Sequence, residues 1–386
     1  MEPRPPSSSA SAIAAGMLGC LVGFGGALPV VLAAAAAVGA TPGQTASWVA
    51  GLCLAIAAST AWLSLRYRLP IVTAWSTPGA AVIAATVGVP IEAAVGAFVA
   101  VALLIVLTSR LQSLARLSER LPMPIAQAML AGVLFRFVAD VALAVPVSPA
   151  LVLPMVGVFL VVRLYNPMAA ALAALATGVA VAVASGIIAW DQTALSAPHL
   201  EFVVPRFDAG VLLGLGMPLF LVTMASQNLT GFAVLRGHGY IPPTRSILGV
   251  TGLLSLATAP LGAHTSNLAA ISGAICTGPD CHPDPARRWI AGVAYSASYA
   301  TLAVLGASVV AVFAVLPKAL IATVAGLALV GAFASALAGA IEAEKSRFAA
   351  VATFAVTASG MSISGVGAPF WGLIAGLAVT ALQRCK

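Results

Sequence analysis

The sequence predicts an all-α polytopic membrane protein with 14 transmembrane spans, arranged as two inverted repeats of seven spans each. The composition is one observation behind this prediction: 61% of the residues are hydrophobic, 8% are charged, and the mean hydropathy is +1.07. A soluble domain carries roughly 25% charged residues, whereas a helix that crosses a bilayer needs about 20 mostly apolar residues. The net charge of +7 does not indicate nucleic-acid binding, because the basic residues are dispersed between apolar runs.

Proline, glycine and charged residues divide the chain into apolar runs, and the polar segment 191–208 separates seven runs from seven. The first set is expected at 13–38, 44–65, 70–88, 91–109, 122–143, 148–164 and 167–190. The second set is expected at 209–234, 246–258, 260–277, 288–315, 317–341, 347–363 and 367–384. Because each repeat has an odd number of spans, the second repeat (205–386) must insert in the opposite orientation to the first (1–190).

The distribution of basic residues is a second observation. With the amino terminus placed in the cytoplasm, 15 of the 18 Lys and Arg residues fall on the cytoplasmic side: Arg4, Arg66, Arg68, Arg110, Arg116, Arg120, Arg163, Arg236, Arg245, Arg287, Arg288, Lys345, Arg347, Arg384 and Lys386. Arg206 and Lys318 fall outside, and Arg136 lies within a span. Cytoplasmic loops are enriched in Lys and Arg, so this bias favours 14 spans with both termini in the cytoplasm.

The third and tenth spans are expected to be broken. Residues 74–81 (AWSTPGAA) and 263–270 (AHTSNLAA) align without a gap, 189 residues apart. In the first copy, β-branched residues predict an extended approach, and the STPG sequence predicts a helix with Thr77 as its N-cap. The second copy is expected to be extended over 259–264, with a helix from Ser266–Asn267. Half a strand at ~3.3 Å per residue and half a helix at ~1.5 Å per residue would together cross one bilayer.

Two such half-helices would direct their N-termini at a shared central region. Each N-terminus carries about half a positive charge and unpaired N–H groups, and paired broken segments in two repeats indicate a transporter's binding site. Spans 1, 3, 8 and 10 hold no acidic residue, which favours an anionic ligand. The expected substrate-binding residues are Gly25, Trp75, Ser76, Thr77, Gly79, Gln227, Asn228, His264, Thr265, Ser266 and Asn267. Trp75 and His264 could stack on an aromatic ring. The alternative is that these residues only cap and pack two broken helices.

Three residues are candidates for proton coupling. Arg136 and Asp140 lie one turn apart in the fifth span, either as a self-neutralising pair, as an anion-attracting charge or as a proton carrier. His264 falls within a span and could carry a proton, or serve as an uncharged hydrogen-bonding group. The CTGPDCHPDPARR segment at 276–288 matches no common zinc pattern, so a turn is expected there and no metal or cofactor.

Several motifs carry a family resemblance. They are PIVTAWSTPGAA at 70–81, the Ala-Gly-x-Leu-x-Arg-Phe run at 131–137, LFLVTMASQN at 219–228, AICTGPDCHPDPARRW at 274–289, VTASG at 356–360 and FWGLIAG at 370–376. At these residues the chain resembles the benzoate:proton symporter (BenE) family, which is similar in architecture to nucleobase and sulfate permeases of the amino acid–polyamine–organocation superfamily. The resemblance implies a core domain of spans 1–4 and 8–11, a gate domain of spans 5–7 and 12–14, and a substrate between spans 3 and 10.

The resemblance also implies a function. It indicates a secondary active transporter, not an enzyme, that imports an aromatic carboxylate such as benzoate with protons across the bacterial inner membrane by alternating access. Nucleobase relatives use membrane carboxylates in spans 8 and 10, where this chain has Ser226-Gln227 and Asn267, so their proton-coupling residue cannot be carried over. Transport of another small organic anion or a nucleobase-like solute, or a passive anion channel, are the alternatives. The expected partners are the substrate, protons, the lipid bilayer and a second copy bound through the gate domain.

Overall fold

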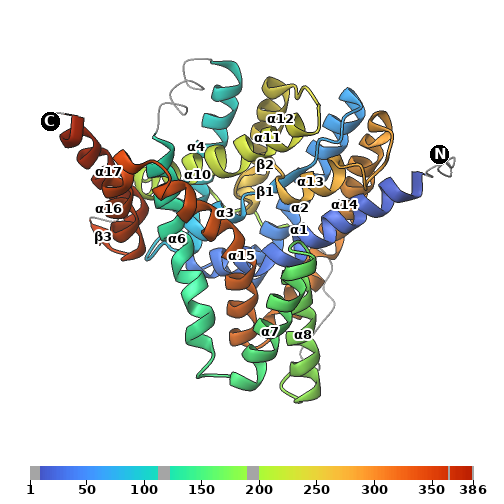
Figure 1. Ribbon diagram of the computed structural model, residues 1–386, viewed down its shortest axis with the longest axis horizontal. Coiled ribbons are helices and arrows are strands. Elements are labelled where there is room, and N and C mark those ends of the chain that lie inside the picture. Colours follow the sequence, from blue (N-terminus) through green and yellow to red (C-terminus); the bar gives the residue numbers. More distant parts are fainter. Residues whose placement is uncertain (1–8, 112–121, 189–199, 364–365, 385–386) are drawn as a thin grey trace.

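The computed structural model describes residues 9–111, 122–188, 200–363 and 366–384, and it is mostly helical (Figure 1). Within these residues, seven helical segments are long and apolar enough to cross a membrane: Ser9–Ala37, Pro42–Tyr67, Ile91–Arg110, Met123–Ala144, Ala209–Gly237, Pro285–Ala314 and Lys318–Ile341. Three shorter apolar helices accompany them, at Pro149–Tyr165, Ala170–Ala184 and Ala368–Gln383. The predicted class, a mostly helical membrane protein, is therefore confirmed.

The elements follow the predicted spans in order. The first half contains α1 (Ser9–Ala37), α2 (Pro42–Tyr67), β1 (Thr73–Trp75), α3 (Thr77–Ala84), α4 (Ile91–Arg110), α6 (Met123–Ala144), α7 (Pro149–Tyr165) and α8 (Ala170–Ala184). The second half begins with a continuous helical stretch that includes two π-helical segments: α9 (Ala209–Val211), η2 (Leu212–Gly216), α10 (Met217–Val222), η3 (Thr223–Asn228) and α11 (Leu229–Gly237). Then follow α12 (Thr244–Thr258), η4 (Ala259–Leu261), β2 (Ser266–Leu268), α13 (Ile271–Thr277), η5 (Pro285–Arg287), α14 (Trp289–Ala314), α15 (Lys318–Ile341), η6 (Glu344–Ser346), α16 (Arg347–Ala358), β3 (Ser362–Ile363), β4 (Val366–Gly367) and α17 (Ala368–Arg384).

The helices pack mainly in two groups. In one group α14 packs on α2, α12 packs on α4, and α1 packs on α3, α13 and α14. In the other, α15 and α16 pack on α6, α17 packs on α16, and α7 packs on α8. Figure 1 shows β1 and β2 side by side near the centre of the first group, while α6, α7, α8 and α15 extend away from them. The strand pair therefore lies inside the protein.

The two central strands form a short antiparallel ladder. Thr73 pairs with Leu268, Ala74 with Asn267, and Trp75 with Ser266. The ladder is extended at both ends, because the Ser76 N–H donates to the Thr265 carbonyl (3.1 Å) and the Ala269 N–H donates to the Val72 carbonyl (3.1 Å). Backbone groups that would be unpaired in lipid thus satisfy each other, as a non-helical segment inside a membrane protein requires.

The predicted helix starts are wrong in both broken spans. In the first, Ser76 rather than Thr77 is the N-cap: its backbone is extended and its hydroxyl accepts from the Gly79 N–H at 3.0 Å. In the second, the region predicted as extended contains η4 and a turn at Gly262 (φ +87°), where a left-handed backbone favours glycine. This turn delays the strand to 266–268, and the helix begins at Ile271 instead of Ser266–Asn267.

Candidate substrate-binding site

The first residue of each central strand is hydrogen-bonded to a hydroxyl group of the preceding α-helix. The Thr73 N–H donates to Thr60 Oγ1 of α2 at 3.0 Å, and the two hydroxyls lie 2.8 Å apart. In the second half, the Ser266 N–H donates to Ser255 Oγ of α12 at 2.8 Å, and those hydroxyls lie 3.0 Å apart. Thr73 and Ser266 are 193 residues apart. The same anchor therefore occurs twice, shifted by four residues from the gapless sequence alignment.

The predicted glycine of α1 lies away from the strand pair. A Cβ atom added to Gly25 would meet the Leu172 side chain of α8, and one added to Gly214 would meet β4 at Val366. These two glycines keep the 189-residue separation of the sequence repeat. They let α1 and η2 approach α8 and β4, as small residues do between membrane helices.

Most of the backbone N–H groups in the first turn of α3 are hydrogen-bonded to the N-cap residue of the same helix. The Ser76 hydroxyl accepts a hydrogen bond from the Gly79 N–H, and the Ser76 carbonyl accepts one from the Ala80 N–H at 2.7 Å. Pro78 has no N–H to satisfy. The Thr77 N–H is the first-turn donor of α3 without a partner among the residues that the structure describes. Gly79 is needed for packing, because a Cβ there would lie 2.6 Å from Leu219 Cδ1 of α10.

His264 joins α2 to the N-cap of α3. The Trp48 indole N–H donates to His264 Nδ1 at 3.0 Å, and His264 Nε2 lies 3.2 Å from the Ser76 carbonyl oxygen. An acceptor at Nδ1 and a donor at Nε2 define a neutral imidazole. The ring is 1% exposed and meets Trp48 and Phe98 at 5.8 and 6.4 Å between centroids. Both nitrogens of this histidine are thus engaged within the protein.

Trp75 belongs to a buried aromatic cluster that the sequence did not predict. Its ring lies 5.6 Å from that of Phe24 in α1 and 6.0 Å from that of Tyr299 in α14, and Tyr295 and Tyr299 lie 4.8 Å apart. Trp75 is 2% exposed, so its faces are covered by these neighbours. The available signal was the pair of tyrosines one turn apart in the Ala- and Val-rich helix α14.

The π-helical segment η3 holds β2. Asn228 Oδ1 accepts from the Leu268 N–H at 3.1 Å, and the Thr223 and Thr265 hydroxyls lie 3.0 Å apart. The Gln227 side chain of η3 is half-buried. A π-helical turn inside a helix is frequent at functional sites. Of the predicted site residues, Asn228, Thr265 and Ser266 therefore fix the strand.

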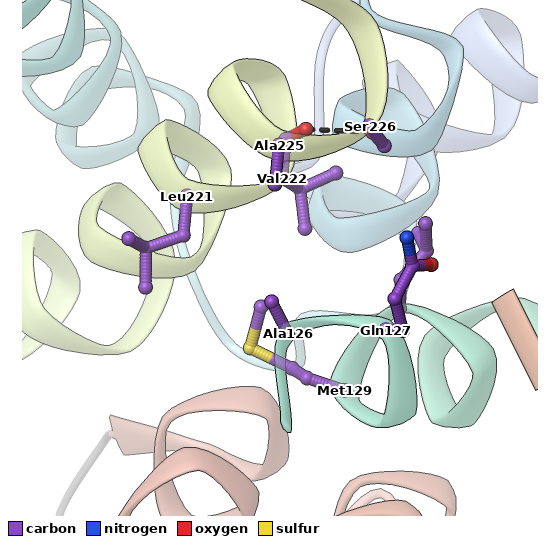
Figure 2. A pocket seen from close by; sticks show the side chains of 8 residues that line it. Ala126, Gln127, Met129, Leu221, Val222, Ala225 and Ser226 are labelled. Carbon is purple, nitrogen blue, oxygen red and sulfur yellow. Dashed lines mark hydrogen bonds between the residues drawn. The ribbon is translucent and has the colours of Figure 1, made fainter. Parts of the chain in front are cut away.

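A pocket lies beside η3, between α10–η3 and α6 (Figure 2). It is a small, partly open pocket, and its lining is Ala126, Gln127, Met129, Leu130, Leu221, Val222, Ala225 and Ser226. Gln127 and Ser226 supply its polar side-chain groups, and the Ser226 hydroxyl donates to the Val222 carbonyl at 2.6 Å. Because η3 also packs on β2 and α3, this mostly apolar pocket is a neighbour of the strand pair.

Comparison with protein families gives the identity. Residues 6–382 match the family described as benzoate membrane transport protein (BenE). The chain belongs to the benzoate membrane transport protein family. It is 37% identical to inner membrane protein YdcO of Escherichia coli K12 over 94% of this chain and 93% of the relative. It is 34% identical to the benzoate membrane transport protein of Acinetobacter baylyi, over 96% of this chain and 94% of the relative.

Two solved structures have the same fold. The transmembrane domain of the cyanobacterial bicarbonate transporter BicA has a TM-score of 0.61 at 16% identity, covering 94% of this chain and 97% of the other. SLC26A9 has a TM-score of 0.60 at 11% identity, covering 98% of this chain and 66% of the other. The family resemblance inferred from the motifs is confirmed, and this BenE member is a membrane transport protein.

In this BenE member the predicted charged pair of the fifth span is not an ion pair. Arg136 is exposed on α6 and Asp140 is half-buried, and within the described part of the chain no ion pair joins them. The Arg136 guanidinium instead lies beside Gly360, which follows α16. The structure therefore shows no direct ion pair between Arg136 and Asp140, and the part of either residue in coupling stays a prediction.

The loop after α13 is a structural latch in this BenE member. The Arg288 guanidinium is buried and donates to the His282 carbonyl through Nε (2.6 Å) and to the Thr277 carbonyl through Nη1 (2.8 Å). A cation at the end of a helix is favoured by the helix dipole, and Thr277 ends α13. Burial raises the pKa of the Cys281 thiol to about 11, although Arg288 opposes the rise. Among the described residues, no group of three or more His, Cys, Asp or Glu side chains is arranged to hold a metal ion.

Proposed function

We propose that this chain is a secondary active transporter of the bacterial inner membrane that imports an aromatic carboxylate such as benzoate, together with protons, by alternating access. The observation that carries this proposal is the buried β1–β2 crossing, in which two short strands each lead into a short helix at the centre of the protein. Family membership and the names of the relatives, one a benzoate transport protein and one an inner membrane protein, support it.

The proposed topology has 14 spans in two inverted repeats (1–190 and 205–386), with both termini in the cytoplasm. The paired hydroxyl anchors at Thr73 and Ser266 support the repeat, as do the paired contacts of Gly25 and Gly214. The concentration of basic residues in the cytoplasmic loops of this topology supports the orientation.

Within this topology α1–α4 and α9–α14 form the core domain, and α6–α8 and α15–α17 form the gate domain. The two groups of mutually packed helices support this division. Pockets lie on the boundary between the groups: one beside η3 and α6, and a second between η2, the segment after α3 and the strands β3 and β4. In the proposed topology these pockets lie toward the cytoplasm and toward the outside. Since every residue of the strand pair except Ala74 is buried, access from either side requires the two domains to separate there.

The substrate would lie between the β1–α3 and β2–α13 junctions, near Ser76, Thr77, Gln227 and Asn267. Importing an anion against a negative interior costs ~2.3 kcal/mol per charge for each 100 mV, so a cation must accompany it. His264, Asp140 and Arg136 are the protein groups proposed for coupling. The hydrogen bonds of His264 to Trp48 and Ser76 favour its role as an uncharged, structural histidine.

Uptake of labelled benzoate into proteoliposomes, with and without an inwardly directed proton gradient, tests this proposal. We expect accumulation above the level of protein-free liposomes, and only with the gradient. Equilibration without accumulation would indicate the passive channel, and benzoate uptake equal to protein-free liposomes would overturn the proposed substrate. Competition by other organic acids and by nucleobases would then identify the alternative.

A further inference from the structure

Asn267 presents a buried acceptor to the interior of the protein. Its side chain is fully buried, and its Nδ2 donates to the Leu268 carbonyl at 2.8 Å. Its Oδ1 has no hydrogen-bond partner among the residues that the structure describes. If the amide oxygen and nitrogen of Asn267 were exchanged, Oδ1 would face the Leu268 carbonyl oxygen, and two acceptors cannot form a hydrogen bond. The atom without a partner is therefore the oxygen. A buried carbonyl without a donor is costly, and native proteins rarely leave one.

The free oxygen lies on the face of the strand pair opposite to the two hydroxyl anchors. Successive side chains of a strand point to opposite faces, and Asn267 is paired with Ala74. On the other face, Thr73 and Ser266 are bound to hydroxyls of α2 and α12, and Trp75 is covered by aromatic rings. Ala74 is partly exposed although its neighbours are buried. Asn267 therefore lies beside the partly exposed Ala74, on the face opposite to the two hydroxyl anchors.

An oxygen acceptor selects a ligand that has a hydrogen to donate. An ionised carboxylate has only acceptors, whereas a protonated carboxylic acid has one O–H donor and one C=O acceptor. The Thr77 N–H, unpartnered within the described residues and three residues after Ala74, is a donor suited to that C=O. A buried anion would meet uncompensated repulsion from Oδ1, and the neutral acid would not.

No charged group on the neighbouring elements changes this preference for the neutral acid over the anion. β2 packs on β1, η3, α2 and α12, and Leu268 meets Gly231 of α11. The titratable side chains of these elements are Cys53, Arg66, Tyr67, Arg236 and Arg245. None is a carboxyl group, and each arginine stands within two residues of a helix end. His264, just before β2, has both nitrogens bound.

We propose that the site holds the aromatic acid in its protonated form, with the carboxyl O–H donated to Asn267 Oδ1, so that the coupled proton travels on the substrate. This inference rests on the proposed function. On the outer side one carboxylate and one proton combine to the neutral acid, and on the inner side the acid releases both. One negative and one positive charge move together, so transport is electroneutral and needs no carboxylate in the protein.

The binding affinity of purified protein for benzoate, measured by titration calorimetry across pH, tests the inference. Aromatic carboxylic acids have a pKa of about 4, so the protonated fraction falls about tenfold for each pH unit above it. We expect the apparent Kd to rise about tenfold per unit between about pH 5.5 and 7.5. Benzamide, which is neutral and keeps an N–H donor, should bind with a Kd that does not change with pH. Methyl benzoate, which has no donor, should not bind.

Asn267→Ala should weaken the binding of benzoate at low pH and of benzamide at every pH, each by about tenfold or more. Thr323→Val, which removes a buried hydroxyl of α15 far from the strands, is the matched control and should leave both affinities unchanged. A benzoate Kd that is constant with pH, together with no binding of benzamide, overturns the protonated-acid site while leaving the proposed transport of benzoate intact. Absence of benzoate binding to the wild type at every pH overturns both.

Discussion

Each of the two broken spans joins a short strand to a short helix, but different residues stabilise the two spans. In the first, β1 leads directly into α3, whose N-terminus is capped by its own Ser76 and begins with Pro78 in its first turn. In the second, Ala270 precedes α13 in a helical conformation (φ −86°, ψ −58°) and gives no side-chain cap. The span is instead stabilised by hydrogen bonds to two residues that lie outside it, Asn228 and Arg288. The first span is thus specified locally, and the second depends on tertiary contacts.

The largest effect is expected at the far end of α13. Arg288→Ala should lower the free energy of unfolding by about 3 kcal/mol, because two carbonyls lose a charged donor in a buried place. Thermal unfolding in detergent measures the change. The matched control is Arg287→Ala, whose side chain is 58% exposed and lies 3.8 Å from Asp284, and which should change stability by less than about 0.5 kcal/mol. Equal effects of the two variants would show that the latch does not stabilise the second span.

A smaller difference is expected between the two strand anchors. The Thr73 hydroxyl bonds to both Ser59 (2.6 Å) and Thr60 (2.8 Å), whereas the Ser266 hydroxyl bonds to Ser255 alone. Thr73→Val should therefore cost about 2 kcal/mol and Ser266→Ala about 1 kcal/mol of unfolding free energy. Denaturation of both variants beside wild type gives the ranking. The reverse order would contradict the view that the first strand has the stronger of the two anchors.

The sequence predicted the helical membrane class, the order of the apolar helices and the two breaks, because hydropathy and the placement of Pro and Gly carry that information locally. The contacts that stabilise the second broken span could not be predicted from the sequence. Asn228 reaches Leu268 across 40 residues and Trp48 reaches His264 across 216, and no periodicity encodes such pairs. Thr77 was preferred to Ser76 as the cap because adjacent hydroxyls look alike in sequence. The turn at Gly262 shifted the second strand by four residues relative to the gapless repeat.

The caps themselves offer a finer comparison. Ser76→Ala should cost about 1 kcal/mol, the usual value of an N-cap side chain. Ala270→Ser should give no comparable gain, since a capping residue needs an extended backbone and Ala270 has a helical one. Melting temperatures of the two variants, each compared with wild type, provide the measurement. A clear stabilisation by Ala270→Ser would mean that the second helix start can adopt the geometry of the first.

The smallest effect at neutral pH concerns Cys281 in the loop after α13. Burial raises the pKa of its thiol from 9.0 to about 11, so the folded state favours the neutral thiol. The resulting stability is fully present below pH 9 and is lost as the pH rises toward 11. The difference in melting temperature between wild type and Cys281→Ser should therefore be constant from pH 6 to 8 and shift against the wild type above pH 9. A difference that is constant up to pH 11 would mean that this thiol is not buried in the fold.

The central claim is that an aromatic carboxylic acid binds at the β1–β2 crossing. A crystal structure with 4-bromobenzoate, located by the anomalous scattering of bromine, tests it most directly. We expect a bromine peak among the residues of β1, β2 and η3, with the carboxyl group toward Asn267. A peak elsewhere in crystals of protein that binds the compound, such as on the outer faces of α7 and α8, would contradict it.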